Sequence, residues 1–490
     1  MTDLAQWSAA QLASAFSRRE LSPVEATEAV LARMDAWEPA INAMYRVDRD
    51  GALAAARAAE ARWHRGEPLS RLDGVSVTIK ENIYTAGDPA PIGTPASDLT
   101  PKTADAPPAA RVREAGCVIV GKTTMPDFGM LSSGNSSMHG RTRNPWQLDR
   151  NTSGSSSGAG AAAAAGYGPL HIGTDIGGSV RLPATHCGIY GLKPSYGRVP
   201  VDPPYFGRCA GPMTRTVGDS ALLLEVLAGP DRRDYMSLPY QPVDYSTNFE
   251  GLSPRGLRFG LLLDAGVGLP TDPAVRAATE AAGRALEAAG AIVEPVTPYL
   301  TDEMFDGIHR FFEARSALDV ARMSAAQRAQ VLPFVLKWCT WRANEFSGAD
   351  VMAAYGQVVS MREAATRVIA QHDFVISPVS PILPYEADAM CPGNDPTNAL
   401  PHIAYTVALN FSEHPAASLN WHHTDDGLPI GVQIAGQRFE DLRVLRASRM
   451  LEQLRRAHGQ YAGCLSVTGR TRSRDRSEYG GKTPRRSSTR

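Results

Sequence analysis

The residues best suited to chemistry lie in one stretch, Asn151–Val199. It opens with hydroxyl and glycine residues at Ser153–Gly158, and the alanine run Ala161–Ala165 that follows predicts a closely packed helix. A second turn comes at Gly173–Ser179, where two glycines directly precede Ser179. Such glycines let the backbone bend tightly and turn successive N–H groups toward one point. This arrangement suits an oxyanion hole beside a serine nucleophile.

The spacing of one lysine and two serines makes the pattern specific. Ser155 and Ser179 are 24 residues apart, and Lys80 lies 75 residues before Ser155, within the segment Gly74–Ile83. In these residues and their sequence contexts the chain resembles the amidase signature family. Members of that family are serine hydrolases whose Ser–Ser–Lys triad has the same two spacings. The resemblance ends near the last predicted helix, and it implies that Lys80, Ser155 and Ser179 form the triad.

The resemblance also implies a role for each group. Ser179 is the nucleophile and Lys80 the base, with Ser155 relaying the proton between them. Lys80 must then be neutral, and burial lowers the pKa of a lysine because desolvation penalises the ammonium ion. The oxyanion would be held by consecutive backbone N–H groups, those of Ile176, Gly177, Gly178 and Ser179. Because the serine loop departs from the family's usual Gly-Gly-Ser-Ser-Gly-Gly-Ser, Ser156 is the alternative relay.

Other residues near the triad are expected to support the loop or contact the substrate. Three residues of the second turn are interpreted as supporting it: Thr174, Asp175 and Arg181. Segment 125–146 is rich in glycine, serine and asparagine, which predicts a loop. In the family this loop lines the site, which makes substrate-contact candidates of Phe128, Gly129, Met130 and Ser132. An ordinary surface loop is an equally good interpretation.

Composition indicates an ordinary globular protein. The chain has 490 residues, a net charge of −1, 43% hydrophobic residues and 21% charged residues. No apolar run approaches the roughly 18 residues of a membrane helix, and the N-terminus lacks the pattern of a secretory signal. The six cysteines are scattered without a CxxC pair, which is typical of reduced thiols and predicts a cytoplasmic protein.

Alternating helix and strand signals predict a single large α/β domain over residues 1–464, and the family resemblance implies a mixed central sheet covered by helices on both faces. Capping boxes begin helices at Ser8 and Ser22. The other predicted helices include Ala52–Trp63, Pro108–Ala115, Val217–Ala228, a helix from Pro273 to Ala289, much of 301–370, and Glu440–His458. The predicted strands are Val118–Val120, Leu257–Leu263, Ala291–Val293, Phe374–Ser377 and Gly431–Ile434.

Residues 465–490 are basic and poor in large apolar residues, which predicts a disordered tail to which we assign no function.

Three motifs invite other interpretations. Gly116–Thr123 matches the phosphate-loop pattern, but its apolar middle favours a buried strand, and Pro126 interrupts the helix that a phosphate loop requires. Gly154–Gly158 fits the GxSxG nucleophile elbow, which needs an apolar strand before it, whereas the preceding residues are polar. His422–Asp426 resembles a metal cluster, but its spacing matches no familiar site and a solvated turn is favoured.

Many aromatic residues fall in the helical segment 301–370. Core packing is the default interpretation, and the alternative is that they cap an acyl pocket and favour bulky acyl groups. These residues are Phe305, Phe311, Phe312, Phe334, Trp338, Trp341, Phe346 and Tyr355.

The sequence therefore predicts a serine hydrolase that cleaves carbonyl–nitrogen bonds of small linear amides or related acyl compounds such as hydrazides, through an acyl-enzyme on Ser179. No metal or organic cofactor is expected, nor any nucleic-acid or membrane partner, and the resemblance admits a homodimer. The alternative is the amidotransferase A-type subunit, which generates ammonia for transamidation of charged tRNA. Its loop typically carries Ser-Thr-Glu-Asn where this chain has Ser132–Asn135, and that departure disfavours it.

Overall fold

A mixed sheet runs through the whole molecule. The computed structural model describes residues 3–457, and over this range eleven strands form one sheet while β4 (Asn135–Ser136) and β5 (Gly140–Arg141) form a second, small one. In spatial order the large sheet consists of β1 (Met44–Val47), β3 (Val118–Thr123), β2 (Ser76–Lys80), β6 (Leu170–Asp175), β8 (Cys209–Thr214), β7 (Tyr190–Lys193), β12 (Ala416–His423), β13 (Pro429–Gly436), β11 (Phe374–Pro378), β9 (Arg258–Leu261) and β10 (Ile292–Pro295).

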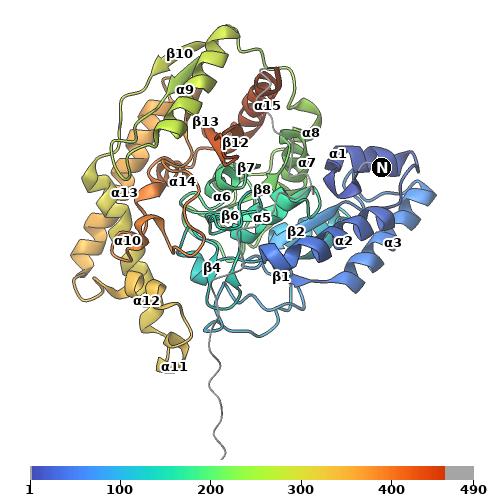
Figure 1. Ribbon diagram of the computed structural model, residues 1–490, viewed down its shortest axis with the longest axis horizontal. Helices are drawn as coiled ribbons and strands as arrows, with labels where there is room; N and C mark the ends of the chain where they lie inside the picture. Colours follow the sequence, from blue (N-terminus) through green and yellow to red (C-terminus); the bar gives the residue numbers. More distant parts are fainter. Residues whose placement is uncertain (1–2, 458–490) are drawn as a thin grey trace, which may run out of the picture.

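Helices cover both faces of this sheet (Figure 1). One face packs against α1 (Ala9–Ser17), α4 (Pro107–Glu114), α7 (Val217–Leu227), α9 (Pro273–Ala288) and α15 (Asp441–Ala457). The other carries α5 (Ser157–Ala165), α6 (Arg181–His186), α10 (Asp302–Ala321), α12 (Pro333–Thr340), α13 (Gly348–Ile369) and α14 (Val407–Phe411). The remaining helices are α2 (Pro23–Ile41), α3 (Arg49–Arg65), α8 (Tyr245–Asn248) and α11 (Ala325–Arg328). None of the helices within residues 3–457 is long and apolar enough to cross a membrane.

Strand alternation decides which face each side chain of β2 occupies. Val77 and Ile79 join the core shared with α1, α4 and α7. Because successive side chains of a strand point to opposite faces, Lys80 must leave the sheet on the other side. Helix α5 packs against β2 and β6 on that side, so the end of β2 delivers the lysine to the start of α5.

The predicted fold class is confirmed, and the structure refines the element boundaries. Both capping boxes are present, at Ser8 and Ser22. The phosphate-loop look-alike lies in the turn before β3 and in β3 itself, a buried strand longer than the three residues predicted. The last helix was predicted to end at His458 and is described to Ala457, and the predicted tail 465–490 lies outside the described residues.

Candidate active site

Two parallel strands bring the catalytic candidates to one edge of the sheet. β2 and β6 are parallel neighbours, with Ile79 opposite Ile172, so Lys80 and the turn after Asp175 come together where both strands end. The N-terminus of α5 packs over this edge and carries Ser155 and Ser156. The structure thus brings together residues that lie in three separate parts of the sequence.

Lys80 is completely buried among hydroxyl groups. Its Nζ lies 2.8 Å from Ser155 Oγ, 3.0 Å from Ser156 Oγ and 3.0 Å from Thr174 Oγ1. Burial and, to a smaller extent, the positive charge of Arg208 together lower the pKa of Lys80 to about 7, against the opposing effects of Asp175 and Glu81. A large fraction of this amine is therefore neutral near pH 7.

The hydrogen-bond pattern distinguishes the two serines. Ser156 Oγ donates to the Thr174 carbonyl (3.1 Å) and accepts from the Thr174 N–H (3.2 Å), so its own hydrogen is already committed. Ser155 Oγ has Lys80 as its one recorded partner among the described residues, and it lines the pocket that Ser179 also lines. A neutral amine has one lone pair to accept with. Ser155 is the hydroxyl that is free both to donate to that lone pair and to face a substrate.

The second turn is built around a buried ion pair. Asp175 accepts from the N–H groups of Gly178 (2.8 Å) and Val180 (3.0 Å), and also binds the guanidinium of Arg181 through both of its oxygens. Arg181 itself is fully buried and donates to Thr406, Asn410 and Gln433. Asp175 and Arg181 therefore hold the turn in shape, whereas Thr174 contacts the amine of Lys80 directly.

This network corrects one oxyanion-hole prediction. The N–H of Gly178 points at Asp175 and is not available to a substrate, and Gly178 does not line the pocket. Among the described residues, the N–H groups of Ile176, Gly177 and Ser179 have no recorded acceptor, and all three residues line the pocket. Gly178 is still required for geometry, because its φ of +126° favours glycine and a Cβ there would lie 2.5 Å from Thr406 Oγ1.

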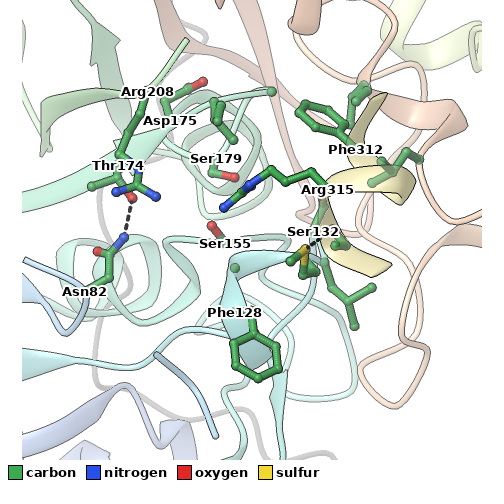
Figure 2. Close-up of a pocket in the computed structure, with 18 of the residues that line it drawn as sticks. Asn82, Phe128, Ser132, Ser155, Thr174, Asp175, Ser179, Arg208, Phe312 and Arg315 are labelled. Carbon is green, nitrogen blue, oxygen red and sulfur yellow. Dashed lines mark hydrogen bonds between the residues drawn. The ribbon is translucent and has the colours of Figure 1, made fainter. Parts of the chain in front are cut away.

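The loop that follows β3 forms one wall of the pocket, not an ordinary surface. Its residues Phe128, Gly129, Met130 and Ser132 all line the pocket, as do Ser155 and Ser179. Figure 2 shows Phe128 and Ser132 on the side of Ser155. Gly129 lies beside Ser155, since a Cβ added at Gly129 would lie 3.3 Å from Ser155 Oγ. Of the aromatic residues in 301–370, Phe312 and Trp338 line the pocket, which matches the pocket interpretation for these two.

Several lining residues were not identified from the sequence. Asn82 donates to Thr174 Oγ1 (3.1 Å) and faces the pocket two residues after Lys80. Five others come from distant segments, and two of them are arginines. They are Arg208, Arg315, Ser316, Leu400 and Ile403. The position of Asn82 beside Lys80 was a signal that could have been used, but nothing local marks the rest.

None of the histidines within the described residues lines this pocket. His171 is fully buried, contacts Thr78 Oγ1 (2.8 Å), and burial lowers its pKa to about 3. His422 and His423 belong to the end of β12, where the His423 ring lies against Trp146. Within residues 3–457 no group of three or more histidine, cysteine, aspartate or glutamate residues is arranged to hold a metal ion.

The sequence and the fold both match known amidases. Residues 25–445 match the family described as Amidase. The chain is 34% identical over 477 residues to the A-type subunit of the glutamyl-tRNA(Gln) amidotransferase of Myxococcus xanthus, covering 90% of this chain and 96% of that protein. It is 33% identical over 461 residues to an acylamidase of Rhodococcus erythropolis, covering 91% and 95%.

Solved structures give the same result. A bacterial aryl acylamidase of the amidase signature family superposes with a TM-score of 0.84 at 29% identity, covering 91% of this chain and 96% of that one. A 6-aminohexanoate cyclic dimer hydrolase complexed with substrate gives a TM-score of 0.82 at 28% identity, covering 92% and 98%. The chain belongs to the amidase signature family of serine hydrolases, enzymes that act on carbon–nitrogen bonds.

Proposed function

We propose that this protein hydrolyses carbonyl–nitrogen bonds of small linear amides, or of related acyl compounds such as hydrazides, through an acyl-enzyme on Ser179. The observation that carries the proposal is the buried Lys80 amine bound to Ser155 in the wall of a pocket that also exposes Ser179. Two other lysines whose pKa is lowered by burial, Lys122 and Lys193, donate instead to the backbone carbonyls of Ile83 and Pro194.

The first half-reaction forms the acyl-enzyme. Neutral Lys80 accepts the Ser155 proton while Ser155 takes the proton of Ser179, and the Ser179 oxygen attacks the carbonyl carbon. Negative charge then develops on the carbonyl oxygen, where the N–H groups of Ile176, Gly177 and Ser179 can receive it. Losing one such donor typically costs about 3 kcal/mol of barrier.

Departure of the nitrogen completes the acyl-enzyme, and attack by water in the second half-reaction then restores the enzyme. The proton held by Lys80 returns through Ser155 to the leaving nitrogen, which departs as ammonia, an amine or a hydrazine. Water then attacks the acyl-enzyme, losing its proton along the same path, and the acid is released with Ser179 regenerated. No step requires a metal or an organic cofactor.

A substrate panel tests the proposal. Aryl and alkyl amides, hydrazides, ureas and esters would be supplied to the purified protein, and ammonia, amine or hydrazine release would be measured. We expect turnover of amides or hydrazides and its loss in Ser179→Ala, with circular dichroism unchanged. Persistent activity in Ser179→Ala, or esterase activity alone across the panel, would contradict the proposal.

Amidotransferase A-type activity is the second candidate, because relatives bearing that name are 32–34% identical to this chain. Against it stands the departure of Ser132–Asn135 from the loop typical of that subunit. The decisive measurement is glutamine-dependent conversion of glutamyl-tRNA by this chain together with its partner subunits. Such activity would replace the hydrolase proposal, and glutamine-independent amide hydrolysis would exclude the transamidation role.

We further propose that the reaction takes place in the cytoplasm. The five cysteines within the described residues are all free and buried, which is typical of proteins from reducing compartments.

A further inference from the structure

Two arginines stand in the wall of the active-site pocket. Arg208 immediately precedes β8, and Arg315 lies on α10. Both line the pocket that contains Ser155 and Ser179, and Figure 2 shows their side chains entering it from opposite walls. Both guanidinium groups lie beside the same ring, that of Tyr205, with distances from Cζ to the ring centroid of 4.9 Å for Arg208 and 4.0 Å for Arg315.

Neither guanidinium has a well-matched carboxylate. Within residues 3–457 the Arg208 side chain makes no recorded hydrogen bond or ion pair. Arg315 has Asp319 as its one carboxylate, at 3.8 Å, on the same helix. Two other buried arginines of this protein bind carboxylates at hydrogen-bond distance, Arg181 with Asp175 and Arg198 with Asp441.

The two guanidinium groups repel each other, and an anion between them would relieve that repulsion. Partial burial lowers the pKa of Arg208, and the charge of Arg315 lowers it further. Two like charges in a sheltered pocket repel each other more strongly than they would in water. A guanidinium has a planar fork of donors that matches a carboxylate, so one carboxylate between the two groups would satisfy both.

We propose that Arg208 and Arg315 bind a carboxylate of the substrate, so that the preferred substrates are amides or hydrazides that carry a free carboxylate besides the scissile bond. This inference rests on the proposed function and narrows its substrate class. The arginines are binding residues, because a guanidinium stays protonated and cannot act as the base. Phe128, Phe312 and Trp338 supply apolar surface for the remainder of the substrate.

Binding to Ser179→Ala tests the inference without requiring turnover. Titration calorimetry would compare two pairs of amides, and in each pair an acetyl group replaces the carboxylate of the charged member. The first pair is glutaramate and 5-oxohexanamide, and the second is 4-acetamidobenzoate and 4′-acetylacetanilide. In at least one pair we expect the carboxylate to bind about tenfold or more tightly than its neutral partner, and less tightly as salt is added.

Variants in the same background locate the effect. Arg315→Met and Arg208→Met should each reduce the ratio of carboxylate affinity to neutral-amide affinity by about tenfold. Arg310→Met is the matched control, because Arg310 lies on the same helix, is exposed, pairs with Asp306 and does not line the pocket. It should retain the full preference.

The outcomes separate this inference from the proposed function. Equal affinity within both pairs, or no measurable binding of either carboxylate, would overturn the inference. If the native protein still hydrolysed neutral amides through Ser179, the proposed function would stand. Carboxylate binding that depends on Arg315, in a native protein that hydrolyses nothing in the panel, would support the anion site and refute the hydrolase.

Discussion

Lys80 is surrounded by hydroxyl groups, and none of its recorded hydrogen bonds reaches a carboxylate. A carboxylate partner would stabilise the ammonium form, whereas hydroxyl groups can donate to the neutral amine as well as accept from the charged one. The burial of Lys80 therefore acts in the direction that a base requires. Arg208 adds to the effect from across the pocket.

The pH dependence follows from this environment. Lys80 is active as a base when it has lost its proton, and its pKa is lowered to about 7, so kcat/KM on a neutral amide should rise with pH through about 7 and then level off. In Arg208→Met a repelling charge is lost, the pKa of Lys80 rises, and the acidic limb should move to higher pH. Initial rates from pH 5 to 10 would check this, and a limb that moves to lower pH would contradict it.

Substituting each of the two serines that contact Lys80 should have unequal effects. Ser155→Ala removes the relay, and we expect kcat to fall by about a hundredfold or more. Ser156→Ala removes a hydroxyl that donates its hydrogen to the Thr174 carbonyl, and we expect kcat to fall by about tenfold or less. Single-turnover kinetics on one amide would compare the variants. A larger loss in Ser156→Ala would make Ser156 the relay.

At the scale of single residues, the sequence predicted the triad but left Ser155 and Ser156 as alternatives for the relay. Adjacent serines in a glycine-rich loop are indistinguishable until the backbone direction is known. The prediction that Gly178 donates to the oxyanion was wrong for a similar reason, because the position of the Asp175 carboxylate depends on its pairing with Arg181.

At the scale of elements, the turn between β6 and α6 depends on the buried pair of Asp175 and Arg181. Arg181→Met would leave a buried carboxylate without its partner, and we expect a loss of about 3–5 kcal/mol in the free energy of unfolding. Urea unfolding followed by tryptophan fluorescence would measure it. The matched control is Arg284→Met on α9, whose exposed side chain lies 3.9 Å from Glu280 and should matter by less than about 0.5 kcal/mol. Equal midpoints for both variants would contradict this role.

Elements with strong local signals were predicted, and elements defined by distant pairing were not. α5 follows from its alanine run, and α1 and α2 follow from their capping boxes. β6 and β8 were missed, because their histidine, glycine and proline residues give no strand pattern. These two strands form because each pairs with buried neighbours on both sides.

At the scale of the whole molecule, the fold class was predictable because the family resemblance carries it. The pocket was not predictable, because its wall is assembled from many separate segments. These are Asn82, the loop at 128–132, Arg208, α10, α12 and the segment around Leu400. Residues this far apart in the chain become neighbours only when the sheet and the helices on its face pack together. Substrate preference is therefore a property of the folded molecule.

The reactivity of the buried cysteines tests the account at the scale of the whole molecule. The five described cysteines are buried, and burial raises the pKa of Cys117 and Cys339 to about 12 and that of Cys209 and Cys391 to about 11. In a Cys464→Ser variant we expect iodoacetamide to modify none of them at pH 8 in the native state, with activity unchanged. Five thiols should react in denaturant. Rapid inactivation of the native protein would contradict a serine mechanism.

The central claim is that neutral Lys80 activates Ser179 through Ser155. The most direct measurement is the rate at which a fluorophosphonate labels the protein as pH is varied, with the labelled residue identified by peptide mass spectrometry. The account predicts one label, on Ser179, at a rate that rises through about pH 7 and is lost in Lys80→Met and Ser155→Ala. A label on another residue, or a Ser179 rate unaffected by Lys80→Met, would contradict it.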